Sequence, residues 1–201
     1  MRQIIWYLFL FVEVVLSSCG RSELGPKEYA YYVQNPNNGL LVTASLSGVQ
    51  YTLQYQPAEY LALLQLKDFS LQEDTFQEQY KRFKGIEHYV FHIDKKEWDN
   101  LTGKARDTAR IRKGMTEYMD FKIQNDIKLV EGDDTIPCGI SECESSMGML
   151  PYYSFIVGFN ARNFNGDREF IFWNKDIGTG NVKMEIKARD INRIPKLKIN
   201  G

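Results

Sequence analysis

Apolar side chains occupy every second position over two stretches near the end of the chain, residues 153–159 and residues 182–186. In the second stretch the intervening positions hold Lys183 and Glu185. Successive side chains of a β-strand point to opposite faces of its sheet, so a period of two predicts strands with one buried face. The charged alternate positions predict that the other face meets solvent, which is typical of antiparallel sheets.

The same alternation recurs earlier in the chain, where residues 40–46 and 49–56 flank the dipeptide Ser47-Gly48. Two alternating runs joined by small turn residues predict a β-hairpin. Residues 86–94 alternate in the same way and predict a further strand.

The dipeptide Asn165-Gly166 is a strong turn signal that follows one of the alternating runs. It predicts a hairpin in which the strand over residues 153–159 pairs with a strand that contains Phe170 and Phe172. Residues 131–148 are mostly polar and predict a loop region.

Three stretches in the middle of the chain predict helices. Pro57 suits the start of a helix because its missing N–H costs little there. Asp74 is expected to cap a second helix that ends at Gly85. Residues 107–119 have apolar side chains at helical spacing and predict a third. The basic residues over 104–113 predict a solvated helix face, with lipid headgroups or an anionic glycan as alternative contacts.

These elements predict an α+β fold: a single antiparallel, β-rich domain with two or three helices in the middle of the chain. The 12 Tyr and 12 Phe of the chain suit this fold, because aromatic side chains pack well on a pleated surface. Strands and helices do not alternate as a parallel sheet requires, and the sequence has no glycine-rich phosphate loop.

The first residues of the chain are those of an export signal. Arg2 precedes an apolar run over residues 4–16, which Glu13 interrupts, and Leu16-Ser17-Ser18-Cys19 follows. The run has the length of a signal-peptide core and is short for a membrane span. The last four residues resemble the lipobox of bacterial lipoproteins, which implies cleavage after Ser18 and a lipid on the Cys19 thiol. An uncleaved anchor or an ordinary signal peptide is the alternative.

Cleavage after Ser18 divides the chain into a signal peptide over residues 1–18, a lipidated tether over 19–27 and a single globular domain over 28–201. Acyl chains on Cys19 would hold the protein on a membrane of the bacterial cell envelope. Residue 20 is Gly rather than the Asp that retains many lipoproteins in the inner membrane, which favours the outer membrane. The net charge of −1 gives no pull toward nucleic acid.

Cys138 and Cys143 are the two remaining cysteines, five positions apart with Gly139 between them. An oxidising compartment lets such a pair form a disulfide, which is the first interpretation. Free thiols are the second interpretation and half of a metal site the third, because two further ligands for zinc are missing nearby.

His88 and His92 are the only histidines of the chain. Within a strand they are about 13 Å apart, too far to share one metal ion. We therefore expect no metal site. We also find no cofactor motif and no catalytic cluster in the sequence.

Three short sequence segments resemble segments of uncharacterised envelope lipoproteins of the Bacteroidota. They span residues 33–40 (VQNPNNGL), 53–60 (LQYQPAEY) and 177–182 (IGTGNV). The resemblance implies lineage and envelope location, and it implies no activity because that group has no assigned catalytic residues.

The sequence therefore predicts a membrane-anchored envelope lipoprotein that is not an enzyme and that binds or scaffolds a partner in the envelope, a protein or a glycan. The alternative is a glycan- or peptide-binding module that uses exposed aromatic residues. The candidates for that role are Tyr31, Tyr32, Trp98 and Trp173. A hydrolase whose site assembles only in the folded chain ranks last.

Overall fold

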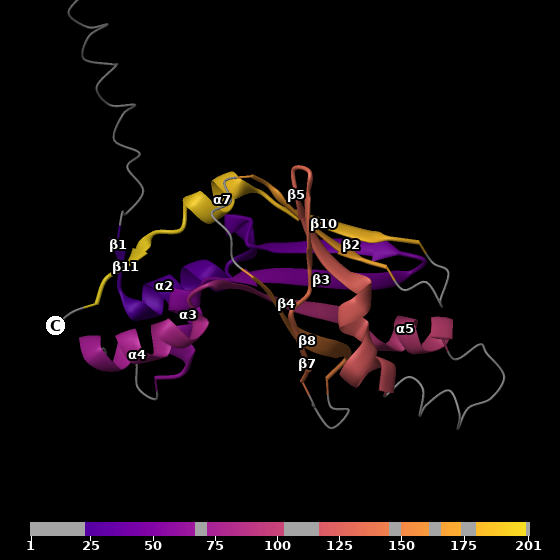
Figure 1. The fold of residues 1–201 in the computed structure, drawn as a ribbon, viewed down its shortest axis with the longest axis horizontal. Coiled ribbons are helices and arrows are strands. Elements are labelled where there is room, and N and C mark those ends of the chain that lie inside the picture. The colour runs from indigo at the N-terminus through magenta and orange to yellow at the C-terminus, as the bar shows by residue number, and fades with distance from the viewer. Residues whose placement is uncertain are drawn as a thin grey trace, which may run out of the picture.

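Two antiparallel sheets pack against each other and enclose the main hydrophobic core (Figure 1). The computed structural model describes residues 23–66, 72–102, 117–144, 150–160, 166–173 and 180–199. Over these residues the protein is a single sheet-rich α+β domain, which confirms the predicted fold class. The predicted signal peptide, Cys19 and most of the helix predicted over residues 107–119 lie outside the described residues.

The larger sheet has five strands over the described residues. In spatial order they are β2 (Leu41–Leu46), β3 (Val49–Gln56), β4 (Ile86–Asp94), β8 (Tyr152–Asn160) and β7 (Ile140–Cys143), each antiparallel to its neighbours. The predicted hairpin of β2 and β3 is confirmed, and so is the strand over residues 86–94. Ser47 and Gly48 connect β2 to β3 with positive φ angles of 53° and 85°. A two-residue turn with positive φ at both residues has a backbone twist that matches the twist of the two strands it connects.

The smaller sheet has four strands in the part of the chain that is described. Their order is β10 (Val182–Ile186), β9 (Arg168–Phe172), β5 (Ile127–Glu131) and β6 (Asp134–Pro137). β9 pairs with β10 on one side and with β5 on the other. The hairpin predicted between residues 153–159 and Phe170–Phe172 is therefore wrong. β8 and β9 are both strands, as expected, but they belong to different sheets.

The loop predicted over residues 131–148 is wrong where β6 and β7 lie, because these residues form strands. Both strands are short and lie at the edges of their sheets. Only Ile136 is buried among the residues of these two strands. An edge strand with mostly exposed side chains has little apolar pattern, and for this reason its sequence resembles that of a loop.

Aromatic rings from both sheets meet at the centre of the main core. The ring centroid of Phe91 on β4 lies 5.0 Å from that of Phe170 and 5.3 Å from that of Phe172, both on β9. Phe155 on β8 and Tyr51 on β3 flank Phe91 within the larger sheet, at 6.2 Å and 6.1 Å. Phe91 therefore joins the two sheets by direct contact.

A group of helices forms a second, smaller core at one end of the sheets (Figure 1). The helices are α2 (Pro26–Gln34), α3 (Ala58–Leu64) and α4 (Glu73–Phe83). Strand β1 (Glu23–Leu24) pairs in parallel with β11 (Lys196–Leu197) beside them, after the short helix α7 (Ala188–Asn192). The N-terminal and C-terminal parts of the described chain thus meet on this end of the molecule.

Helix α3 begins directly after Pro57, as predicted. α4 ends near Gly85, as predicted, but Asp74 is not its cap. Gln72 precedes the first turn without a side-chain cap, and Asp74 lies inside that turn, where its negative charge interacts favourably with the helix dipole.

Residues 118–126 form the helical turns η3 (Tyr118–Lys122) and η4 (Ile123–Asp126). One further expectation on local structure is wrong. The tether expected over residues 19–27 overlaps β1 and α2, so the folded body includes residues from Glu23 onward. Three helices were not foreseen: α2 and α7 near the ends of the chain, and α5 (Lys95–Thr102) directly after β4.

Replacing Phe91 by alanine tests this account of the core. Because Phe91 is fully buried between both sheets, we expect Phe91→Ala to lower the free energy of unfolding by about 3–5 kcal/mol. Urea unfolding followed by circular dichroism measures the change. Thr43→Ala, at an exposed position of β2, is the control. A loss below about 1 kcal/mol for Phe91→Ala would contradict the packing described.

Candidate functional site

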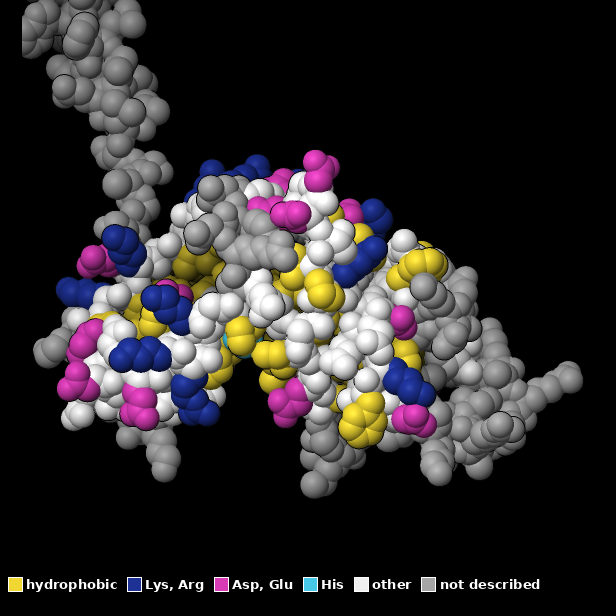
Figure 2. Space-filling model, viewed as in Figure 1, with side chains coloured by type: hydrophobic (Ala, Val, Ile, Leu, Met, Phe, Trp, Pro, Cys, Tyr) yellow, Lys and Arg dark blue, Asp and Glu magenta, His cyan; other side chains and the backbone are white. Residues whose placement is uncertain are grey.

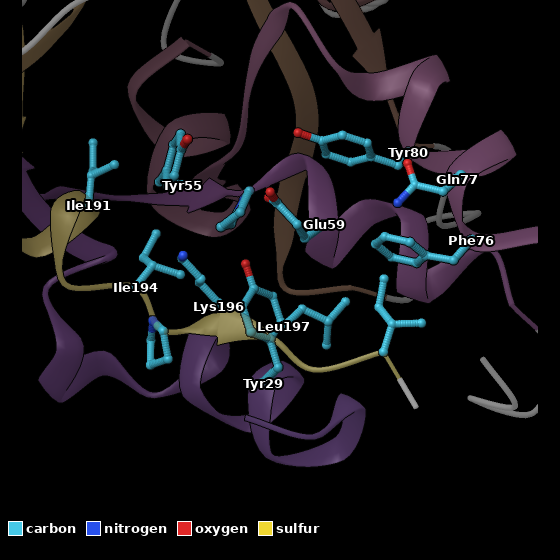
Figure 3. Close-up of a pocket in the computed structure, with 13 residues that line it drawn as sticks. Tyr29, Tyr55, Glu59, Phe76, Gln77, Tyr80, Ile191, Ile194, Lys196 and Leu197 are labelled. Atoms are coloured by element: carbon cyan, nitrogen blue, oxygen red, sulfur yellow. The ribbon is translucent and has the colours of Figure 1, made fainter. Parts of the chain in front are cut away.

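A pocket of about 430 Å³ lies between the helices of the smaller core and the C-terminal segment (Figure 3). Its apolar lining consists of Pro57, Phe76, Ile191, Ile194, Pro195, Leu197 and Ile199. Its polar lining consists of Tyr29, Tyr55, Glu59, Gln77, Tyr80 and Lys196. A volume of this order and a mixture of apolar walls with a few polar groups are typical of small-molecule sites.

Four structural elements bring Glu59 and the three tyrosines of the pocket together. Tyr29 comes from α2 and Tyr55 from the end of β3. Glu59 lies in the first turn of α3, two residues after Pro57, where the helix dipole favours an acidic side chain. Tyr80 comes from α4. In Figure 3 the hydroxyl groups of Tyr29 and Tyr80 are directed toward the space around the Glu59 carboxylate.

The tyrosine hydroxyls of the pocket are held in their neutral form. Burial raises the pKa of Tyr29, and the negative charge of Glu59 and the nearby Tyr55 and Tyr80 hydroxyls raise it further. Burial also raises the pKa of Tyr80, together with the charge of Glu59 and a hydrogen bond to that carboxylate. At neutral pH these hydroxyls therefore remain protonated, and each is able both to donate and to accept a hydrogen bond.

Glu59 has no cationic partner among the residues that the structure describes. The ion pairs formed by those residues involve other carboxylates, and the Glu59 side chain is half-buried. Lys196 lines the same pocket, but it forms no ion pair with Glu59 and is exposed. A half-buried carboxylate inside a pocket, without a salt-bridge partner from the described residues, is the distinctive electrostatic feature of the site.

A buried charge network lies behind the Tyr55 wall of the pocket. Arg168 on β9 donates to both carboxylate oxygens of Glu87 on β4, at 2.9 Å and 3.4 Å. The Tyr89 hydroxyl donates to the same carboxylate at 2.9 Å. Glu131 lies 4.0 Å from Arg168 and accepts a hydrogen bond from the Gly166 amide. The Tyr55 ring packs edge-on against Tyr89 at 5.4 Å, so this network supports one side of the pocket.

The two histidines lie on β4 and do not share a site. Burial lowers the pKa of His88, and a hydrogen bond to the Phe83 backbone opposes the shift. His92 stacks on Tyr152 with ring centroids 4.2 Å apart. Among the described residues, no group of three or more His, Cys, Asp or Glu side chains is placed to hold a metal ion.

The sheet brings His92, Ser154 and Glu144 together, which the sequence analysis did not foresee. His92 on β4 pairs with Ser154 on β8, and Glu144 follows β7. The Ser154 hydroxyl donates directly to the Glu144 carboxylate, and the Ser154 side chain is buried. A nucleophilic serine needs a bond to a histidine base and access to substrate. The described contacts include no bond between Ser154 and His92, so this group does not favour the hydrolase hypothesis.

Cys138 and Cys143 are both free thiols in the structure, in place of the disulfide that was the first interpretation. Cys143 ends β7, and Cys138 precedes that strand by two residues. An extended chain rises about 3.3 Å per residue, which separates the two Cα atoms well beyond the roughly 7 Å limit for a disulfide. The Cys138 thiol instead donates to the Ile140 carbonyl oxygen at 2.9 Å.

The four aromatic residues proposed for ligand binding do not form one site. Trp98 is fully buried in the main core, whereas Trp173 is exposed at the end of β9. Tyr31 and Tyr32 line a second, more open hollow of about 450 Å³ beside Leu24. The sequence did not indicate the pocket of Tyr29 and Glu59, although Tyr55 and Glu59 belong to the segment over residues 53–60. Their partners Tyr29 and Tyr80 are remote in sequence, and no local pattern indicates that contact.

No helix in the described parts of the chain is long and apolar enough to cross a membrane. No family model, curated protein or solved structure matches this chain. The evidence for the candidate site is therefore the geometry of its residues.

The two thiols give a direct test of the local structure. We expect both Cys138 and Cys143 to be alkylated by iodoacetamide when the purified, non-reduced protein is unfolded. In the folded protein both react slowly, because burial raises the pKa of each thiol and the thiolate is the reactive form. Mass spectrometry of the peptides measures the labelling. A Cys138–Cys143 disulfide in the non-reduced sample would show that this arrangement is wrong.

Proposed function

We propose that the protein is a lipid-anchored binding protein of a bacterial envelope, in which Cys19 carries the lipid and the pocket of Tyr29, Glu59 and Tyr80 receives a ligand. The observation that carries the proposal is this pocket, whose apolar walls surround a small set of convergent polar groups. The lipobox-like segment Leu16–Cys19 supports a location in the cell envelope. Within the envelope, we propose the outer membrane.

The pocket favours ligand binding over a purely scaffolding role. A protein-binding face is expected to present a contiguous apolar patch. The large apolar side chains that are exposed in the described chain belong to several different elements, such as Tyr31 on α2, Phe121 on η3 and Trp173 after β9. A pocket with aromatic and acidic residues fits a small molecule or part of a peptide better.

Cys19→Ala tests the anchor. In a bacterial host we expect the unaltered chain to incorporate radiolabelled palmitate and to sediment with membranes. The variant is expected to take up no label and to leave the membrane fraction, because two or three acyl chains supply the stable attachment. Ser22→Ala, in the same segment, is the control and is expected to behave as the unaltered chain does. Equal labelling of the Cys19→Ala variant would refute lipidation at this residue.

Ligand binding is tested by thermal unfolding of the full chain, purified in detergent, against a panel of amino acids, short peptides and oligosaccharides. A ligand at about 100 times its Kd stabilises the folded state by about 2.7 kcal/mol, so we expect at least one ligand to raise Tm. Ile194→Trp, which fills the pocket, is expected to abolish the shift, whereas Ile140→Trp on β7 is expected to retain it. A panel without any Tm shift, or a shift that Ile194→Trp retains, contradicts the proposed site.

A further inference from the structure

The polar atoms that converge in the pocket are mainly oxygen atoms. The Tyr29 and Tyr80 hydroxyls and the Glu59 carboxylate face the same space (Figure 3), and the Tyr55 hydroxyl lies close enough to interact electrostatically with Tyr29. Tyr29 itself is buried, with a side chain only 1% exposed. Oxygen atoms in this arrangement accept hydrogen bonds, and the carboxylate adds a full negative charge.

No described residue forms an ion pair with this negative charge. Glu59 has no salt-bridge partner among the described residues, and its one hydrogen-bonding neighbour, Tyr80, is neutral. Partial burial of a charge is costly unless an opposite charge or hydrogen bonds compensate for it. A ligand that brings a positive charge and N–H donors would therefore gain a charge-assisted hydrogen bond at Glu59.

The apolar part of the pocket indicates what carries that charge. Ile191 and Ile194 of the C-terminal segment lie at one end of the pocket and Phe76 at the other, with Glu59 between them (Figure 3). A short aliphatic stem would lie against one of these apolar groups while its charged end reaches Glu59.

We propose that the pocket binds an organic cation with N–H donors, a primary ammonium or guanidinium group on an aliphatic stem, with Glu59 as its counter-ion. This inference rests on the proposed function, because it names the ligand class of the same pocket. Both a free amine and a lysine or arginine side chain of a peptide present this chemistry.

Lys196 provides an internal check on the sign of the charge. Lys196 lines the pocket from β11 and is an exposed residue. It would repel a bound cation and attract an anion or the carboxylate of a zwitterion. Removing this charge therefore strengthens the binding of a cation and weakens the binding of an anion.

The test titrates small probes into the full chain, purified in detergent with isotope-labelled tyrosine, and follows the tyrosine ring signals by NMR. The cationic probes are n-butylammonium and n-butylguanidinium, with n-butanol, butyrate and n-butyltrimethylammonium as neutral, anionic and N–H-free counterparts. We expect the two N–H cations to bind about tenfold or more tightly than butanol, because only they combine N–H donors with a positive charge opposite the Glu59 carboxylate.

Three variants assign the effect to Glu59. Glu59→Gln is expected to remove the preference for cations, and Lys196→Met is expected to tighten cation binding by roughly two- to fivefold. Glu78→Gln makes the same change of charge at an exposed position of α4 and is expected to change nothing. Acetyl-lysine amide and acetyl-arginine amide, added as further probes, distinguish a peptide side chain from a free amine.

The outcomes separate this inference from the proposed function. If butanol or butyrate binds as tightly as the cations, or if Glu59→Gln keeps the preference, the ligand class is wrong while the pocket remains a binding site. If no probe shifts a tyrosine signal while a panel ligand raises Tm in a pocket-dependent manner, the ligand class is again wrong. If neither experiment detects binding, the proposed function is wrong as well.

Discussion

The contact between Arg168 and Glu87 is the interaction on which the rest of the structure depends. It joins β9 of the smaller sheet to β4 of the larger sheet, and both side chains are almost completely buried. Burial alone would lower the pKa of Arg168, but its hydrogen bond and charge interaction with Glu87 outweigh this and hold the pKa above its usual value. Removing one partner of such a pair leaves an uncompensated buried charge, which costs about 3–5 kcal/mol.

The same ion pair connects the core of the protein to its pocket. Glu87 also accepts the hydrogen bond of Tyr89, whose ring supports Tyr55 in the pocket wall. Tyr29 and Glu59 complete the site from the helical end of the molecule, where Figure 2 shows charged side chains around apolar ones. The two packed sheets therefore hold one side of the pocket, and helices with the C-terminal segment form the other. The proposed binding site is thus largely preformed, which limits the entropy lost on binding.

Local sequence patterns predicted which residues form strands and helices better than they predicted which strands pair with each other. The period of two located β3, β4, β8 and β10, because each buries apolar side chains at alternate positions. It did not reveal that β8 and β9 lie in different sheets, since alternation carries no information on which strand is adjacent. The pocket was missed for the same reason: Glu59 is one acidic residue in a short helix until Tyr29 and Tyr80, distant in sequence, are placed beside it.

The central claim is that a preformed pocket holds an organic cation against Glu59. A crystal structure of the full chain with n-butylguanidinium tests this claim most directly. The account predicts a guanidinium nitrogen within about 2.7–3.2 Å of a Glu59 carboxylate oxygen, with the butyl stem against Ile194 or Phe76 and the pocket otherwise unchanged. A structure in which Lys196 itself fills the pocket and bonds Glu59, or in which the ligand binds elsewhere, would contradict it.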